Sequence, residues 1–230
     1  MKFDFSTPTP LQYFTTLVRS DEHLPLLEAA ASLAQDEYPE LDVQQVLSDV
    51  DHLAARLARR VAEGAGAVDR LRALNQLFFA DLGFGGNVND YYNPDNSYLH
   101  RVLHTRRGIP ISLAVLWLEL AQGLGLDVQG IGFPGHFLVQ VTLDEGRVVI
   151  DPFTGQSLGR GELRERIEEF HPQLPYTPSS DLPLALCLRP ASPRQILARM
   201  LRNLQDIHRT QEDWQRFVPV QDRLIALLPD

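Results

Sequence analysis

The sequence predicts an α+β fold, in which one buried helix packs on a small antiparallel sheet between helical segments at both ends. Three observations predict it. Helical periodicity of apolar residues runs through residues 1–82, short β-branched runs typical of strands follow Gly125, and helix start signals return at Ser192. We therefore expect a helical N-terminal region packed on the core (1–82), a core (83–190) and a C-terminal helical hairpin (191–230).

The N-terminal region shows recognisable helix starts. Thr9-Pro10-Leu11-Gln12 has the form of a capping box with proline at the first helical position, and Asp42-Val43-Gln44-Gln45 is a second cap. The apolar residues between these starts and Leu82 recur at helical spacing. The stretches concerned are Leu24 to Ala34, Val46 to Val61, and Asp69 to Leu82.

Residues 83–97 follow neither the helical nor the strand period. Three glycines, four asparagines and a proline predict an irregular loop. Such a loop carries function when a rigid scaffold positions it, or it is a surface loop held by Asx-turns, and both alternatives remain open. The adjacent Tyr91 and Tyr92 favour a packed or ligand-facing arrangement. Asn96 or Ser97 is expected to cap a short helix that ends at Arg107.

Within the core, a helix is expected to begin after Gly108, with Pro110 near its first turn, and to run to Gly123; it is apolar on nearly every face and is therefore expected to be central. Three strands should follow it, and then a charged surface helix. Leu184 to Leu188 is a further expected strand, and the proline- and serine-rich Pro172 to Pro183 is a boundary between the core and the tail. The expected strands are Val128 to Ile131, His136 to Val141 and Arg147 to Ile150, and the charged helix is Gly161 to Phe170.

Composition excludes several function classes. A net charge of −9 repels phosphate backbones and anionic lipid, so we expect neither nucleic-acid nor membrane binding. The N-terminus lacks the pattern of a signal peptide, and the longest apolar run is too short to span a bilayer, so we expect a cytoplasmic protein. The single cysteine, Cys187, has apolar neighbours typical of a buried structural thiol. No cofactor is expected. His100 and His104 have zinc-compatible spacing, but Arg101 lies where a glutamate would be needed, so no metal site is predicted.

His136 and Asp151 lie 15 residues apart across one predicted hairpin, a spacing that lets neighbouring strands bring their side chains together. A helix start followed by strands that carry a histidine and an acid is the layout of a papain-like nucleophile site. The helix N-terminus stabilises the anion of the nucleophile, the imidazole transfers the proton, and the acid fixes the imidazole tautomer.

Four sequence motifs extend this likeness. They are Tyr91 to Leu99, Arg106 to Leu113, Gly132 to Val139, and Ile150 to Phe153, and together they resemble the SirB-type transglutaminase-like family. The resemblance covers most of residues 10–190 and implies a transglutaminase-like fold, with His136 and Asp151 at the positions of the family histidine and acid. Members are described as regulators.

The resemblance also implies a cysteine at the head of the buried helix, at Pro110 or Ser112, and neither position holds one. Ser112 is a serine nucleophile or an ordinary first-turn hydroxyl that bonds to the backbone. We expect Tyr91, Tyr92, Asn96 and Arg107 to contribute to binding. Two functions follow: a non-catalytic protein-binding or regulatory scaffold with a protein or peptide partner, or an amide or ester hydrolase that uses Ser112, His136 and Asp151.

The C-terminal segment, Asn203 to Asp230, resembles one tetratricopeptide repeat. Since a helical solenoid needs about three repeats, a single unit must pack on the core, or the natural chain continues with further repeats. A plain helical hairpin that closes the domain is the alternative. The oligomeric state is not predicted.

Overall fold

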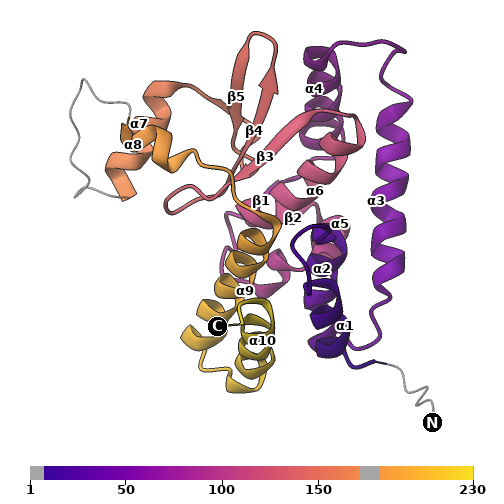
Figure 1. Cartoon of the computed structure of the whole chain (residues 1–230), viewed down its shortest axis with the longest axis vertical. Helices are drawn as coiled ribbons and strands as arrows, with labels where there is room; N and C mark the ends of the chain where they lie inside the picture. The colour runs from indigo at the N-terminus through magenta and orange to yellow at the C-terminus, as the bar shows by residue number, and fades with distance from the viewer. Residues whose placement is uncertain (1–7, 171–181, 230) are drawn as a thin grey trace.

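The computed structural model describes residues 8–170 and 182–229 (Figure 1). The N-terminal region is helical, as the sequence predicts. The Thr9 capping box opens the first helix, and the Asp42 carboxylate caps α3 by accepting from Gln44 N and Gln45 N. The elements are α1 (Pro10–Leu17), α2 (Leu26–Ser32), the 3-10 turn η1 (Leu33–Asp36), α3 (Val43–Ala58), α4 (Ala67–Asn75) and the π-helical turn η2 (Gln76–Asp81).

The loop after η2 is irregular but contains short regular pieces. β1 (Gly85–Gly86) pairs in parallel with β2 (Arg107–Gly108), and a 3-10 turn, η3 (Pro94–Ser97), leads into α5 (Leu99–Thr105). The predicted cap at Asn96 or Ser97 is wrong. Asn93 caps η3, and α5 begins after Tyr98 without a side-chain cap, because the Asn96 side chain is used inside the loop.

The centre of the molecule is α6 (Pro110–Gly123), which is buried on nearly all sides. It packs against β3 (Asp127–Ile131) and β4 (Leu138–Leu143) of an antiparallel sheet of order β3-β4-β5-β6, which β5 (Gly146–Ile150) and β6 (Ser157–Leu158) complete. The other face of the sheet packs on α7 (Arg160–Phe170) and α8 (Leu182–Cys187) through a separate apolar cluster that includes Leu138, Leu163 and Leu184. The sheet therefore separates two apolar cores. Figure 1 shows α7 and α8 on one side of the sheet and α6 on the other.

Two strand predictions are wrong. His136 precedes β4 instead of lying in it, because its N–H donates to Phe133 O across a turn in which Gly135 has a φ of 64°. Leu184 to Leu188 is helical, with Leu188 N donating to Leu184 O. An apolar run of five residues fits a helix or a strand equally well. The residue that pairs with the edge strand β3 is Pro190, which forms an isolated antiparallel bridge with Ile131. Of the predicted boundary at Pro172 to Pro183, only the last two residues lie within the described part of the chain.

The C-terminal segment is a hairpin of α9 (Pro193–Thr210) and α10 (Trp214–Leu227), and α9 begins with the predicted capping box at Ser192. The hairpin packs on α1 and α2, so the first and last helices of the described chain lie side by side (Figure 1). One apolar cluster joins Phe14, Trp117 and Leu201, so the N-terminal region, the core and the tail share a single interior. The division into three parts and the likeness of the hairpin to a tetratricopeptide repeat stay predictions.

None of the helices within the described residues is long and apolar enough to cross a bilayer.

Candidate functional site

The antiparallel register of β4 and β5 brings His136 and Asp151 together. Val139 pairs with Ile150, so the start of β4 and the end of β5 lie at the same edge of the sheet. His136 lies two residues before the start of β4, and Asp151 immediately follows β5. His136 Nε2 lies 2.8 Å from Asp151 Oδ1. The structure therefore joins the two residues that the sequence predicted as partners.

The Asp151 carboxylate is 1% exposed and has three partners. Oδ1 accepts from His136 Nε2 and from Phe153 N at 2.9 Å, and Oδ2 forms an ion pair with Arg166 Nη2 at 3.0 Å. Burial alone would raise the pKa of Asp151, but His136, the Phe153 N–H and Arg166 together lower it below its ordinary value. Asp151 is therefore ionised at neutral pH.

An ionised carboxylate can only accept hydrogen bonds, so His136 Nε2 carries a proton and donates it to Asp151. In the neutral imidazole, Nδ1 is then the unprotonated, basic nitrogen. The His136 side chain is 16% exposed, and its ring lies edge-on to Phe153 with centroids 6.2 Å apart. This geometry suits proton transfer or hydrogen bonding to a bound group, and it orients the ring as the acid of a triad would.

The head of α6 offers no free nucleophile. Pro110 occupies the first helical position, and Ser112 is fully buried. Ser112 Oγ lies 2.6 Å from Asn96 O and 3.0 Å from Ile109 O, and it accepts from Ile109 N at 3.1 Å. The hydroxyl is thus used by the backbone, and the structure does not bring it to His136 as a hydrogen-bond partner.

The predicted binding residues of the loop divide into two kinds. Asn96 is buried and holds the loop together, because its amide donates to Asp90 O at 2.6 Å and to Tyr91 O at 3.2 Å. Arg107 is also engaged within the chain, with Nη1 donating to Gly83 O at 2.5 Å. Tyr92 is 73% exposed, and its ring lies edge-on to that of Tyr91. The two tyrosines and Arg107 are exposed, but the Arg107 guanidinium is held by backbone carbonyls, so the tyrosines suit binding best.

Sequence reasoning missed two contributors. Arg166 was taken as part of a charged surface helix, yet it neutralises Asp151. The Phe153 ring lies over Gly86, where an added Cβ would come within 2.2 Å of ring atoms, and Gly86 N donates to Phe153 O at 2.9 Å. The glycine pair of the loop was the available signal for this close approach, whereas no spacing rule links Arg166 to Asp151.

Two cavities follow one another along α9 beside this site. The first, of about 160 Å³, lies between the loop tyrosines and the C-terminal half of α9. It is lined by Tyr91, Tyr92, Ile109, Asn203, Asp206, Ile207 and Thr210. The second, of about 550 Å³, lies between the Gly132 turn, the end of α8 and the N-terminal half of α9. Asn203 lines both, so the two cavities adjoin each other at this residue, and we call the pair the α9 groove. Cys187, predicted to be buried, is only half-buried and lines the second cavity.

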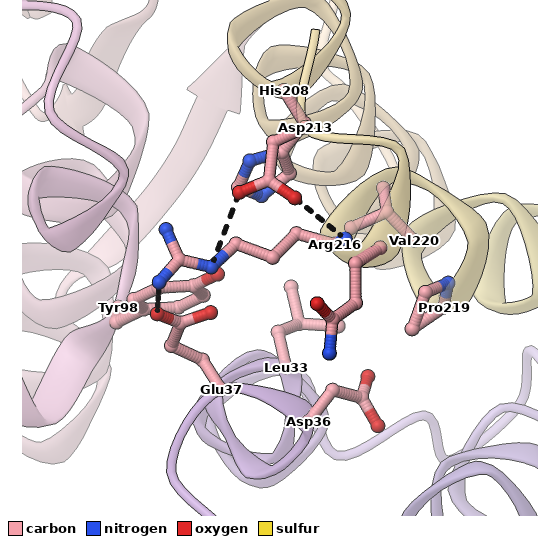
Figure 2. A pocket seen from close by; sticks show the side chains of 10 residues that line it. Leu33, Asp36, Glu37, Tyr98, His208, Asp213, Arg216, Pro219 and Val220 are labelled. Carbon is pink, nitrogen blue, oxygen red and sulfur yellow. Dashed lines mark hydrogen bonds and ion pairs between the residues drawn. The ribbon is translucent and has the colours of Figure 1, made fainter. Parts of the chain in front are cut away.

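A third cavity, of about 610 Å³, lies on the other side of the hairpin, between η1, Tyr98 and α10 (Figure 2). Its charged side chains all have ion-pair partners, and that of Asp36 is Arg223, which lies outside the lining. Arg216 lies 2.6 Å from Glu37 and 3.5 Å from Asp213, as Figure 2 shows. His208 also lines it, 1% exposed, and neither ring nitrogen has a hydrogen-bond partner within the described residues. Burial lowers the pKa of His208, so the ring is neutral at neutral pH.

Within residues 8–170 and 182–229, no group of three or more histidine, cysteine, aspartate or glutamate side chains is placed to hold a metal ion.

Comparison with known proteins identifies the family of the chain. A family model described as "Transglutaminase-like superfamily" matches residues 44–202, which include α6, the sheet and the His136–Asp151 pair. The chain belongs to the transglutaminase-like superfamily. A UPF0162 protein of Xylella fastidiosa (strain 9a5c) is 41% identical over 211 residues, which cover 91% of this chain and 74% of the relative, so the chain is also a member of that family.

Two other relatives of this superfamily member match less of the chain. UPF0162 protein PA3419 of Pseudomonas aeruginosa is 32% identical over 80% of this chain and 64% of its own length. F-box only protein 21 of Homo sapiens is 46% identical over 70 residues, which are 30% of this chain and 11% of that protein. No solved structure matches significantly.

Proposed function

We propose that this protein is a non-catalytic, protein-binding scaffold of the transglutaminase-like superfamily, and that an extended segment of its partner lies in the α9 groove beside His136. The observation that carries the proposal is the head of α6. Pro110 has no nucleophilic atom, and the Ser112 hydroxyl is buried and bonded to Asn96 O and Ile109 O. His136 and Asp151 are therefore positioned as in a triad, but the head of α6 supplies no free nucleophile for His136 to activate.

The surface around the groove supports binding. Tyr92 and Val88 are both 73% exposed on the same loop, and exposed aromatic side chains are enriched where proteins bind partners. Tyr91 is held more firmly, because its ring packs near Phe153 with centroids 6.0 Å apart. A rigid aromatic beside a small cavity gives an anchor for one apolar side chain of the partner.

The alternative, a Ser–His–Asp hydrolase, needs Ser112 Oγ within hydrogen-bond reach of a His136 ring nitrogen. Ser112 Oγ is instead engaged with the backbone of Asn96 and Ile109, and within the described residues it forms no hydrogen bond with His136. Activating the serine would require breaking its hydrogen bonds to Asn96 and Ile109. This geometry argues against the hydrolase.

The test is selection of peptides from a displayed random library on the intact protein, followed by measurement of their dissociation constants. We expect Tyr92→Ala to weaken the selected peptides about tenfold, since buried aromatic anchors dominate such interfaces. Ile225→Ala is the matched control, because Ile225 is 60% exposed on α10 and lines neither cavity of the groove.

Equal effects of the two substitutions would contradict binding in the groove. Labelling of the wild-type protein by a serine-directed phosphonate, with loss of labelling in Ser112→Ala, would overturn the non-catalytic assignment and favour the hydrolase.

A further inference from the structure

The larger cavity of the α9 groove has a distinctive charge. Three arginines, Arg189, Arg199 and Arg202, line it, and none of its lining residues is acidic. The chain as a whole has 30 acidic and 21 basic residues, so a cavity lined by three bases and no acid is opposite in sign to the rest of the protein. The third cavity of Figure 2 differs, because its arginine is neutralised by Glu37 and Asp213.

The three guanidinium groups are placed differently. Arg199 is fixed, because its Nη1 donates to Phe133 O at 3.0 Å and its guanidinium lies 5.8 Å from the centre of the Phe137 ring. Arg189 and Arg202 are exposed and form no ion pair with any residue in the described part of the chain. Other arginines of the C-terminal hairpin do find acids, as Arg194 does with Asp21 and Arg209 with Asp206. The cavity therefore holds one positioned cation and two available ones.

The basic cavity and the cavity beside the tyrosines lie along the same face of α9. Gln195, Arg199 and Arg202 line the basic end, Asn203 lines both ends, and Asp206, Ile207 and Thr210 line the other. These positions recur every three or four residues, so they form one face of α9. Arg199 also lies next to the turn that carries His136, since it bonds to Phe133 O. A single ligand can contact both cavities without leaving this helix face.

We propose that the basic cavity binds acidic side chains of the partner segment, while an apolar residue of the same segment occupies the cavity beside Tyr91 and Ile207. This inference rests on the proposed function and names the chemistry of the partner. Arg199 and Ile207 are eight residues apart, and at 1.5 Å per residue their positions on α9 are separated by about 12 Å. An extended peptide advances about 3.3 Å per residue, so the acidic and apolar residues of the ligand should lie three or four positions apart.

The test uses three fluorescein-labelled synthetic peptides and the full chain. The first has two adjacent glutamates four positions from one phenylalanine, the second replaces both glutamates by glutamine, and the third keeps the first composition but places the phenylalanine next to the glutamates. Fluorescence anisotropy at low ionic strength should rank the first peptide tightest, by about 5- to 30-fold over the second.

The variants locate the effect. Arg189→Gln combined with Arg202→Gln should weaken the first peptide by a similar factor and leave the second unchanged, because both guanidinium groups are exposed and their loss does not disturb the core. Arg72→Gln, which removes an exposed charge on α4 far along the chain from the groove, is the matched control and should have little effect.

The outcomes separate the two proposals. Equal binding of the first two peptides, both sensitive to Tyr92→Ala, overturns the acidic specificity and leaves the scaffold function standing. Binding that depends on the arginines but not on Tyr92 or on phenylalanine spacing overturns peptide binding in the groove. Displacement of the first peptide by inorganic phosphate at low millimolar concentration would identify a small-anion site and overturn the peptide assignment. Absence of binding by all three peptides overturns the acidic and apolar pattern proposed for the partner, whereas the scaffold function is overturned only if the random library also yields no peptide that depends on Tyr92.

Discussion

Ser112 provides the most direct test of whether the head of α6 is structural or catalytic. The substitution is Ser112→Ala, which removes a fully buried hydroxyl. That hydroxyl accepts from Ile109 N at 3.1 Å and lies 2.6 Å from Asn96 O, to which it donates. Two hydrogen bonds are lost, each contributing about 1 kcal/mol to the free energy of unfolding.

The remaining groups are not left wholly unpaired, because Ile109 N also donates to Asn96 O at 3.3 Å. We therefore expect Ser112→Ala to lower the free energy of unfolding by about 2 kcal/mol. For a chain of this size that corresponds to a fall in Tm of roughly 4–8 °C. Thermal unfolding can be followed by the fluorescence of Trp117, which is fully buried.

Ser97→Ala is the matched control. Ser97 is as buried as Ser112, but its Oγ has no hydrogen-bond partner within the described residues. Replacing an unsatisfied buried hydroxyl by a methyl hydrogen should leave Tm unchanged or raise it. A Tm of Ser112→Ala within about 1 °C of the wild type, or an equal loss in both variants, would refute the structural role of Ser112.

Three other substitutions test the packing and the charges. Gly86→Ala should lower Tm in a thermal-shift assay by roughly 4–8 °C and expose the site, because the new Cβ would meet the Phe153 ring; an unchanged Tm would contradict the close approach. Asp151→Asn should lower the free energy of unfolding at pH 7 by about 2–4 kcal/mol. Because the pKa of Asp151 is lowered in the folded state, its carboxylate stabilises the fold above the ordinary pKa of 3.8, and the loss should shrink as the pH falls and this contribution disappears. A loss of stability that does not change with pH would argue against the ion pair. Because the pKa of His208 is lowered in the folded state, the unfolded chain binds the proton more readily, and stability should fall as the pH drops below the ordinary pKa of 6.5. In His208→Leu the urea concentration at the unfolding midpoint should therefore depend less on pH between pH 7 and 5. A pH dependence equal to that of the wild type would exclude His208 as the cause.

Local signals were sufficient where one short stretch determines the outcome. The capping boxes at Thr9 and Ser192 and the all-apolar α6 were predicted because cap chemistry and periodicity act over a few residues. The pairing of His136 with Asp151 was also predictable, since a hairpin of β4 and β5 fixes which strand ends meet.

The errors came from competition between local and distant interactions. Asn96 is of a residue type that often caps helices, but its side chain donates within the loop to Asp90 O and Tyr91 O. Arg166 was indistinguishable from other surface charges, because only the packing of α7 against the sheet brings it to Asp151. The place of Arg199 in the groove was likewise unpredictable, because it follows from the packing of α9 beside the Phe133 turn. Single-sequence patterns carry no information on such contacts.

The hydrogen bond from Gly86 N to Phe153 O has a consequence for the order of folding. It joins residues 67 positions apart. Closing so long a loop costs more conformational entropy than forming the local contacts within a helix. We expect α3 and α6 to form early and the junction of the loop with the end of β5 to form late. Hydrogen exchange at the Gly86 amide should therefore report the assembly of the whole site, slowing only when the distant halves of the chain have met.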